Sequence, residues 1–284
     1  MAKAKAIVHG AVSLVNAIAN KKGATLGISL TVEAVVETSP GKGIIIQSKN
    51  KTLSSRLINK TIEKILSKKD LEQNKITVSL ESEIPTGYGL KSSSAISSAV
   101  ALACSKIFKP KMTDKQILLA GVEASIESKV SITGAYDDAC SCYFGGFNVT
   151  DNAKKKVVHS ERIPSNLVAI IFIPKNRKRG NVKNLKTLSS VFDNAWELAR
   201  TQNYWEAMII NGLATSTILN SDPSIITNLL DKGAIAASVS GNGPAIAAIV
   251  KKGNESNVKR VFSSLEGSII VSKVNNKKAE VHEL

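Results

Sequence analysis

Apolar and polar positions follow each other in patterns that predict a chain of mixed strands and helices. Stretches of apolar and β-branched residues predict strands at residues 4–9, 28–38, 44–47 and 76–80. The turn Pro40-Gly41-Lys42-Gly43 separates the second of these strands from the third. Before the fourth strand, apolar residues recur at helical spacing and predict a helix over residues 54–68.

The second part of the chain continues the same alternation of elements. Small residues recur in two predicted helices, at 93–107 and 114–127, and a strand is expected at 143–149, followed by a turn at the lysine run 154–156. Further strands are predicted at residues 167–173, 234–240, 245–250 and 268–274, and further helices as a pair within 183–220 and singly at 224–231 and 255–265. This order predicts an α+β fold with mixed sheets and helices on one side of each.

The composition is that of an ordinary globular protein, with 43% hydrophobic and 21% charged residues in 284. No apolar run reaches the roughly 18–20 residues that cross a bilayer, and no signal peptide is recognisable, so we expect a cytoplasmic protein with no membrane partner. Three scattered cysteines (Cys104, Cys140 and Cys142) favour buried thiols over a zinc site or a disulfide.

The formal net charge of +15 allows three interpretations. It is typical of nucleic-acid-binding proteins, it attracts anionic nucleotides, and it also fits a lysine-rich solvated surface. Aromatic residues make up only 4% of the chain, which leaves few stacking platforms for single strands. Nucleic acid is therefore not favoured as the main partner, although a basic nucleic-acid-binding protein stays as an alternative.

The segment Pro85-Thr-Gly-Tyr-Gly-Leu-Lys-Ser-Ser-Ser-Ala95 carries the strongest chemical signal. Glycine lets a backbone approach a phosphate closely, and the free N–H groups at the start of the following helix favour an anion. The alternative is an ordinary turn with serine caps. A Walker motif is excluded, because Leu90 precedes Lys91 where that motif requires glycine.

Two further segments are weaker when each is taken alone. Asp137 and Asp138 are adjacent carboxylates after Gly134, and they suit metal binding and proton transfer, a solvated turn or the N-cap of a short helix. Ser238-Val-Ser-Gly-Asn-Gly-Pro-Ala245 is a glycine-rich turn between two apolar strands, which an ordinary hairpin loop would also explain.

Taken together and in this order, the segments resemble the motifs of the GHMP kinases, over nearly the whole chain. The first motif resembles Lys5-Ala-Ile-Val-His-Gly10, and the third resembles residues 238–245. The second motif, Pro-x-x-x-Gly-Leu-x-Ser-Ser, is matched at Pro85, Gly89, Leu90, Ser92 and Ser93. Glu127 and Asp138 have the spacing of the family's metal-binding glutamate and catalytic aspartate.

The resemblance implies a fold and a division into domains. It implies an N-terminal domain at residues 1–150 that is similar to ribosomal protein S5 domain 2 and binds ATP, and a ferredoxin-like α+β domain at residues 151–284. The implied activity is transfer of the γ-phosphate of ATP to an alcohol in the presence of Mg²⁺. The chain could act as a homodimer, which the sequence does not decide.

The resemblance also implies roles for particular residues. Asp138 would be the catalytic base or orienting group, with Lys5 beside it, and Ser93 and Glu127 would hold Mg²⁺. ATP would be bound by the loop residues Pro85, Thr86, Gly87, Tyr88, Gly89, Leu90, Lys91, Ser92, Ser93, Ser94 and Ala95. The substrate would meet Asp137, Arg179, Ser240, Gly241, Asn242 and Gly243.

Within the family, the stretches Asn16 to Ala24, Gly89 to Ala95 and Ser131 to Asp138 are most similar to the archaeal type of shikimate kinase, so shikimate is the expected substrate. Its carboxylate calls for a cationic partner, for which Arg177, Lys178 and Arg179 are candidates. Kinases of the homoserine and mevalonate types are the alternatives. The first usually carry asparagine where Asp138 stands, and the second tend to be longer.

Overall fold

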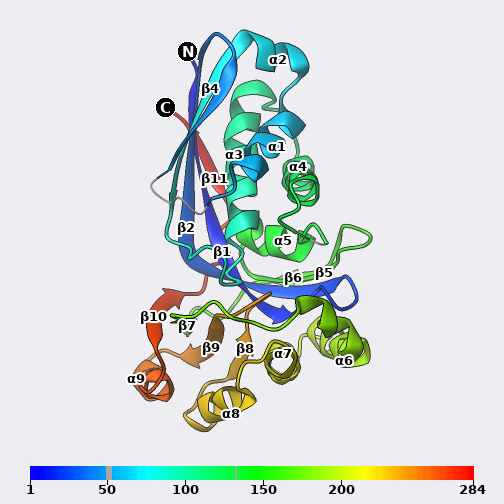
Figure 1. The fold of residues 1–284 in the computed structure, drawn as a ribbon, viewed down its shortest axis with the longest axis vertical. Helices are drawn as coiled ribbons and strands as arrows, with labels where there is room; N and C mark the ends of the chain where they lie inside the picture. The colour runs from blue at the N-terminus through cyan, green and yellow to red at the C-terminus, as the bar shows by residue number, and fades with distance from the viewer. Residues whose placement is uncertain (49–52, 132) are drawn as a thin grey trace.

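The computed structural model describes residues 1–48, 53–131 and 133–284, which form two β-sheets with helices packed against them (Figure 1). The larger sheet has the strand order β11-β1-β2-β4-β3, and β5 and β6 extend it beyond one end of β2. The smaller sheet has the order β10-β7-β9-β8 and lies below the larger one in Figure 1. The functional residues predicted from sequence come from both.

Two long antiparallel strands, β1 (Lys3–Val15) and β2 (Lys22–Pro40), form the centre of the larger sheet. Strand β4 (Asn74–Ser82) pairs antiparallel with β2, and β3 (Gly43–Ser48) pairs parallel with β4. The other strands come from later in the chain: β5 (Phe147–Asp151) pairs with β2, β6 (Lys156–Glu161) with β5, and β11 (Glu280–Glu283) with β1.

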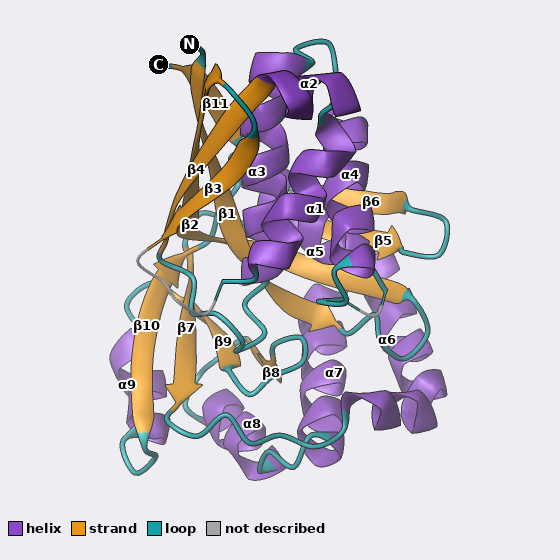
Figure 2. Cartoon of the chain, turned by 45° about the horizontal axis from the view of Figure 1, so that its top comes forward, coloured by secondary structure: helices purple, strands orange, loops and turns teal. Residues whose placement is uncertain are grey.

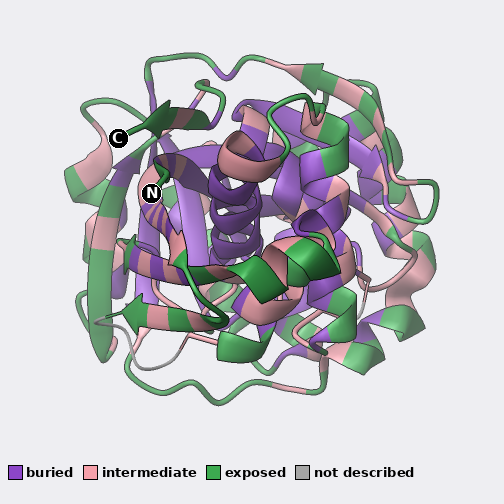
Figure 3. Ribbon diagram, turned by 90° about the horizontal axis from the view of Figure 1, so that it is seen from above, coloured by how far each residue is buried: buried purple, intermediate pink, exposed green. Residues whose placement is uncertain are grey.

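Five helices cover one face of this sheet (Figure 2). They are α1 (Ser55–Ile65), α2 (Lys68–Gln73), α3 (Ser92–Phe108), α4 (Asp114–Glu127) and α5 (Tyr136–Phe144). Helix α3 lies between the sheet and the other helices and is buried along most of its length, as the view from above shows (Figure 3). Its alanines and serines allow this close packing, because small side chains let neighbouring elements approach.

The smaller sheet is antiparallel throughout, with β7 (Leu167–Pro174), β8 (Ala236–Val239), β9 (Ile246–Lys251) and β10 (Gly267–Lys273). The helices α7 (Tyr204–Ile218), α8 (Pro223–Asp231) and α9 (Glu255–Lys259) pack on it, and 3₁₀ turns lie at Val182–Leu188 and Arg260–Phe262. Helix α6 (Ser189–Arg200) packs on α7 and on β1 and β2 of the larger sheet. Helix α7 packs on both β8 and β1, so it joins the two halves.

Most predicted elements are present, and four differ from the prediction. Helix α2 begins at Lys68, the last residue of the predicted 54–68 helix, because Ser67 caps a new helix with a capping box to Asp70. Helix α5 occupies a stretch for which a turn and a short helix are both expected, and the helix is what forms. Strand β6 begins at the end of the lysine run 154–156, where a turn near the domain boundary was expected. Strand β11 is short and has no strong alternation of apolar and polar residues.

The two sheets do not correspond to the two chain segments, 1–150 and 151–284, that are expected from the resemblance. Strands β6 and β11 belong to the larger sheet, although both follow that residue. The division into domains 1–150 and 151–284 therefore stays a prediction about folding units. Among the helices of the described residues, none combines the length and the apolar character that crossing a membrane requires.

Candidate functional site

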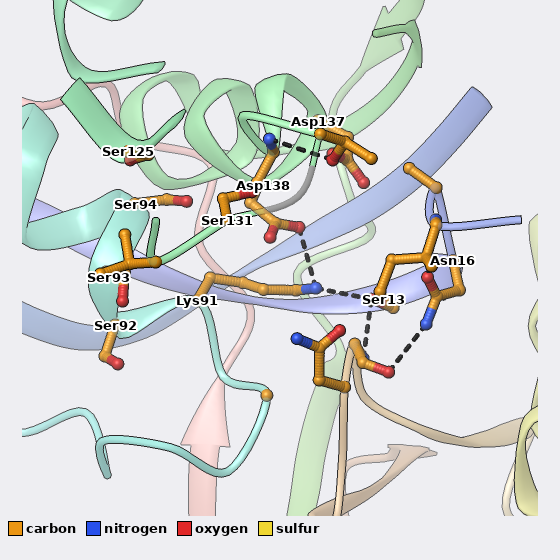
Figure 4. A pocket seen from close by; sticks show the side chains of 18 of the residues that line it. Ser13, Asn16, Lys91, Ser92, Ser93, Ser94, Ser125, Ser131, Asp137 and Asp138 are labelled. Carbon is orange, nitrogen blue, oxygen red and sulfur yellow. Dashed lines mark hydrogen bonds and ion pairs between the residues drawn. The ribbon is translucent and has the colours of Figure 1, made fainter. Parts of the chain in front are cut away.

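A cavity of about 260 Å³ lies where the start of α3, the start of α5 and the loop after β8 meet the end of β1 (Figure 4). It collects residues that are far apart in the sequence. The predicted site residues that line it are Gly87, Gly89, Lys91, Ser92, Ser93, Ser94, Asp137, Asp138, Arg179, Gly241 and Asn242.

The start of helix α3 forms one wall of the cavity. Lys91 precedes the helix in a left-handed conformation (φ 66°), and no side chain of the described residues caps this end. The first helical hydrogen bond runs from the Ala95 N–H to the Lys91 carbonyl, so the N–H groups of residues 92–94 precede the helical pattern. These N–H groups, the helix dipole and the serine hydroxyls suit an anion.

Helix α5 presents a second helix start to the same cavity. Ala135 precedes it in a left-handed conformation (φ 52°) and makes no capping hydrogen bond of its own, whereas the Asn152 side chain accepts from the Asp137 N–H in the first turn. The Ala139 N–H makes the first helical bond, to the Ala135 carbonyl. Asp137 and Asp138 lie in the first turn, where carboxylates are favoured by the helix dipole.

A buried ion pair connects the two helix starts. The Lys91 ammonium lies 2.8 Å from the Asp138 carboxylate and donates a 2.7 Å hydrogen bond to the Ser13 hydroxyl, as the dashed lines in Figure 4 mark. The Lys91 side chain is 5% exposed. Burial acts to lower the pKa of Lys91, but the charges of Asp138 and Asp137 outweigh it and raise that pKa above its ordinary value, so the lysine stays charged.

Asp137 lies deeper than Asp138 and makes structural contacts. Its carboxylate accepts a 2.7 Å hydrogen bond from the Asn152 amide, and its backbone N–H donates to the same side chain. A Cβ at Gly23 would lie 2.3 Å from the carboxylate, so only glycine fits there. Burial and the neighbouring Asp138 charge raise the pKa of Asp137 to about 7, against the opposing effect of Lys91.

The glycine-rich loop after β8 closes the cavity from the side of the smaller sheet. The Ser240 hydroxyl donates to the Gly89 carbonyl at 2.8 Å, and the Gly241 N–H donates to the Ser13 hydroxyl at 3.0 Å. A Cβ at Gly89 would lie 1.9 Å from the Ser240 carbonyl oxygen, so the two loops approach this closely only with glycine there. Ser240 and Gly243 shape this loop without lining the cavity.

Arg179 reaches the cavity from the loop that follows β7. Its Nη1 donates to the carbonyl oxygens of Asn242 and Gly243, both at 3.1 Å. These bonds fix one edge of the guanidinium on the glycine-rich loop and leave its other donors for a ligand. Arg177 stacks on the Tyr88 ring, 4.6 Å from its centroid, and thereby covers the outside of the α3 loop.

Two predicted site residues lie elsewhere. Lys5 is on the outward face of β1 and pairs with Glu33 at 2.5 Å. Lys5 and Ser13 are eight residues apart on β1, which corresponds to about 26 Å at the usual rise of a strand. Because Ser13 and Asp138 both contact Lys91, Lys5 is too far away to reach Asp138. The Glu127 carboxylate is exposed at the end of α4, where it pairs with Lys64 and does not line the cavity with Ser93.

The expected magnesium site is therefore not assembled as a set of acidic ligands. Among the residues that the structure describes, no three His, Cys, Asp or Glu side chains are grouped as a metal site. The cavity does offer hydroxyl oxygens around Ser93 and the carboxylate of Asp138, which are the oxygen ligands that a hard cation prefers.

The rest of the predicted loop supports the cavity from behind. Leu90 and Ala95 are buried in the core, and five of the eleven predicted loop residues are absent from the cavity wall, namely Pro85, Thr86, Tyr88, Leu90 and Ala95. Ile132, part of the stretch that carried the resemblance, lies outside the described residues.

Sequence reasoning missed several residues of the wall. They come from β1, the β1–β2 turn, α4 and the segment between α4 and α5, and they are Ser13, Asn16, Ala17, Ile18, Ser125, Lys129, Val130, Ser131, Thr133 and Ala135. Asn16 donates to the Gly241 carbonyl at 2.8 Å, which ties the turn to the glycine-rich loop. The stretches 16–24 and 131–138, which carry the resemblance to the archaeal shikimate kinases, are the signals that could have suggested most of this wall.

Comparison with known proteins is consistent with this geometry. A family model described as the GHMP kinases N terminal domain matches residues 56–146. The chain is 36% identical over 279 residues to the shikimate kinase of Methanothrix thermoacetophila, a match that covers 97% of this chain and 95% of that protein. It is 35% identical over 280 residues to the shikimate kinase of Methanobrevibacter smithii, covering 94% and 95%.

Solved structures show the same fold at lower identity. The homoserine kinase from Cytophaga hutchinsonii superposes with a TM-score of 0.78 at 21% identity, covering 99% of this chain and 97% of that one. The mevalonate kinase of Methanococcus jannaschii gives 0.75 at 16% identity, covering 96% and 98%. The fold and the full-length relatives together place the chain in the GHMP kinase family. Its relatives at 35–36% identity are archaeal shikimate kinases, so the predicted family and fold are confirmed.

The raised pKa of Asp137 predicts a pH-dependent cost to stability. The folded chain holds a proton on Asp137 up to about pH 7, whereas an unfolded aspartate releases it near pH 4. The folded state thus binds more protons between these values, and the free energy of unfolding must fall as the pH rises through this window, by at most about 4 kcal/mol.

Urea unfolding of the wild type and Asp137→Asn between pH 4 and pH 8 measures this effect. The variant keeps an acceptor for Asn152 but cannot ionise, so the wild type should lose stability relative to it as the pH rises. Asp231→Asn, an exposed carboxylate on α8, serves as the control and should run parallel to the wild type. A wild-type-to-variant difference that is constant over this range would contradict the assignment.

Proposed function

We propose that this protein is an ATP-dependent kinase that phosphorylates the 3-hydroxyl of shikimate to give shikimate 3-phosphate. The observation that carries the proposal is the buried Lys91–Asp138 pair beside an uncapped helix start in one cavity. This arrangement combines an anion-binding wall with a carboxylate that can accept a proton. The names of the archaeal relatives support shikimate as the acceptor.

The start of α3 is the proposed binding site for the phosphates of ATP. Three successive N–H groups and hydroxyls at residues 92–94 supply donors, and the helix dipole adds favourable potential. Lys129 reaches the same cavity from the segment after α4 and adds a positive charge. Phosphoryl transfer depends chiefly on alignment and charge neutralisation, which this wall would supply.

Asp138 is the proposed proton acceptor. As the acceptor oxygen bonds to the γ-phosphorus, the bond from that phosphorus to ADP breaks and the hydroxyl proton passes to the Asp138 carboxylate. Lys91 is the cation beside this carboxylate, at 2.8 Å, in the role that the resemblance had suggested for Lys5.

Arg179 is the proposed partner of the substrate carboxylate. Its guanidinium is held by two backbone carbonyls, at 3.1 Å each, and its remaining donors suit a bidentate contact with a carboxylate. Asn242, Gly241 and Asp137 lie in the same wall and would bound the substrate. The distance along the cavity from Arg179 to Asp138 would then select an acid with a hydroxyl at the right separation.

Magnesium is proposed as the companion of ATP. The Ser93 hydroxyl and the Asp138 carboxylate are the oxygen ligands that the cavity offers near the proposed phosphate site, and a bound Mg²⁺ would neutralise phosphate charge there. A cytoplasmic location and a homodimer remain predictions from the sequence.

The first prediction from this proposal concerns the alcohol that accepts the phosphoryl group. Purified protein with ATP and Mg²⁺ should release ADP when shikimate is added and should do so far less with homoserine or mevalonate. A coupled ADP-release assay measures all three. Turnover of homoserine or mevalonate in preference to shikimate would assign the chain to another kinase of the family, and salt-sensitive nucleic-acid binding without ATP turnover would refute the kinase proposal.

The second prediction concerns the proton acceptor. Asp138→Asn should lower kcat by about 10²–10⁴-fold, because the amide cannot take the hydroxyl proton. ATP binding should persist, since the wall at residues 92–94 is unchanged. Asp231→Asn is the control for removal of a carboxylate at the surface. Wild-type kcat in Asp138→Asn, with ATP binding intact, would remove Asp138 from its proposed role.

The third prediction tests the predicted metal ligand. Glu127 pairs with Lys64 at the surface, so Glu127→Gln should leave kcat within about threefold of the wild type, as expected for an exposed ion pair. The Mg²⁺ concentration that gives half-maximal rate should also stay unchanged. A rise of tenfold or more in that concentration would show that Glu127 binds the metal in the working enzyme.

A further inference from the structure

Ser13 holds an unusual position in the cavity wall. It lies near the end of β1 and is 1% exposed, yet it lines the cavity beside Lys91 (Figure 4). Its hydroxyl oxygen accepts two hydrogen bonds, one from the Lys91 ammonium at 2.7 Å and one from the Gly241 N–H at 3.0 Å.

The direction of both bonds is fixed by chemistry. A lysine ammonium and a backbone N–H can only donate, so Ser13 must be the acceptor in each. A serine oxygen has two lone pairs, and both are occupied here. The one hydrogen bond that this hydroxyl can still make is a bond donated by its own O–H.

The neighbouring groups do not accept this proton. The hydroxyl of Ser240 accepts from the Ser13 backbone N–H at 3.2 Å and gives its own proton to the Gly89 carbonyl. Within the described parts of the chain, the Ser13 hydroxyl accepts from Lys91 and Gly241 and donates no hydrogen bond. A buried donor without a partner costs about 1–3 kcal/mol, and this one lies in a cavity wall, where a ligand oxygen can accept from it.

Lys91 adds a second donor at the same place. Its ammonium has three N–H bonds, of which Ser13 and Asp138 each take one, so one remains. An unpaired hydroxyl and an unpaired ammonium proton, less than 3 Å apart at their heavy atoms, form a site for an oxygen with negative charge.

We propose that Ser13 is a catalytic residue that donates its O–H to an oxygen of the phosphoryl group in transfer. This inference rests on the proposed function, in which that group moves from ADP to an alcohol beside Asp138. Ser13 keeps its proton throughout, while the acceptor hydroxyl gives its own proton to Asp138. The contact strengthens as negative charge is redistributed over the phosphoryl oxygens, so it favours the transition state.

The variant Ser13→Ala tests the contact. Removal of one such donor should lower kcat by about 10–10³-fold, with little change in the KM of either substrate. The affinity for ADP with aluminium fluoride, Mg²⁺ and shikimate, which mimics the transferring group, should fall by a similar factor, while the affinity for ADP alone should stay the same. A merely structural serine would change neither selectively.

Ser98→Ala is the matched control. Ser98 is also a serine at 1% exposure, it has no hydrogen-bond partner among the described residues, and it lies along α3 outside the cavity wall. The kcat of Ser98→Ala should equal that of the wild type. If Ser13→Ala does not fold, Ser13→Cys keeps a small side chain with a weak donor and should show a smaller loss of kcat.

The possible outcomes separate this inference from the proposed function. A wild type that is inactive with shikimate refutes the proposed substrate, and Ser13→Ala is then compared with it in the hydrolysis of ATP by water, which needs the same phosphoryl contacts. Equal rates in that comparison, or an increase in the shikimate KM with unchanged kcat, would overturn the inference. A selective loss of kcat and of affinity for the aluminium fluoride complex would support it.

Discussion

The buried ammonium of Lys91 is the interaction on which the site depends. A charge at 5% exposure is tolerated only when it is paired and hydrogen-bonded, because removing it from water costs several kcal/mol. Its partners come from α5 (Asp138) and from β1 (Ser13), and Ser13 is bonded in turn to the loop after β8. One side chain therefore connects the start of α3 to α5, to β1 and, through Ser13, to the loop after β8.

This constraint explains why glycines stand at the points of closest approach. Gly89 brings the α3 loop against the Ser240 carbonyl, and Gly23 leaves room for the Asp137 carboxylate behind Asp138. A Cβ at either position would separate segments that the Lys91 network holds together. The larger sheet supplies β1 and β2 for this purpose, and the smaller sheet supplies the loop after β8, so the cavity exists only where the two halves join.

The elements that the sequence predicted most accurately are those whose structure is decided by local patterns of residues. Helix α4 and most of α3 were predicted from apolar and small residues at helical spacing. This spacing is visible in the sequence because it follows from which faces of each helix are buried. Strand β11 forms because β1 offers a free edge, and α5 begins at a left-handed alanine, so neither has a strong local signal. The loop at residues 85–95 could be singled out from its glycines and serines, because their backbone properties are local, and six of its residues line the cavity. Its binding of phosphate stays a prediction. Lys5 and Glu127 were misplaced because spacing along a chain does not tell which face of an element a side chain occupies.

The charges of the cavity show why two adjacent aspartates are compatible with an anionic ligand. Two carboxylates and one ammonium would leave a net negative charge, which would repel phosphate. Burial holds the proton on Asp137 up to about pH 7, so that Lys91 and Asp138 form a neutral pair and the helix starts and Lys129 give the wall a positive character. A bound triphosphate would raise the pKa of Asp137 further, because a negative charge nearby favours the protonated form. The deeper carboxylate is therefore held neutral when such a ligand is present, which reduces the negative charge that the cavity presents to it.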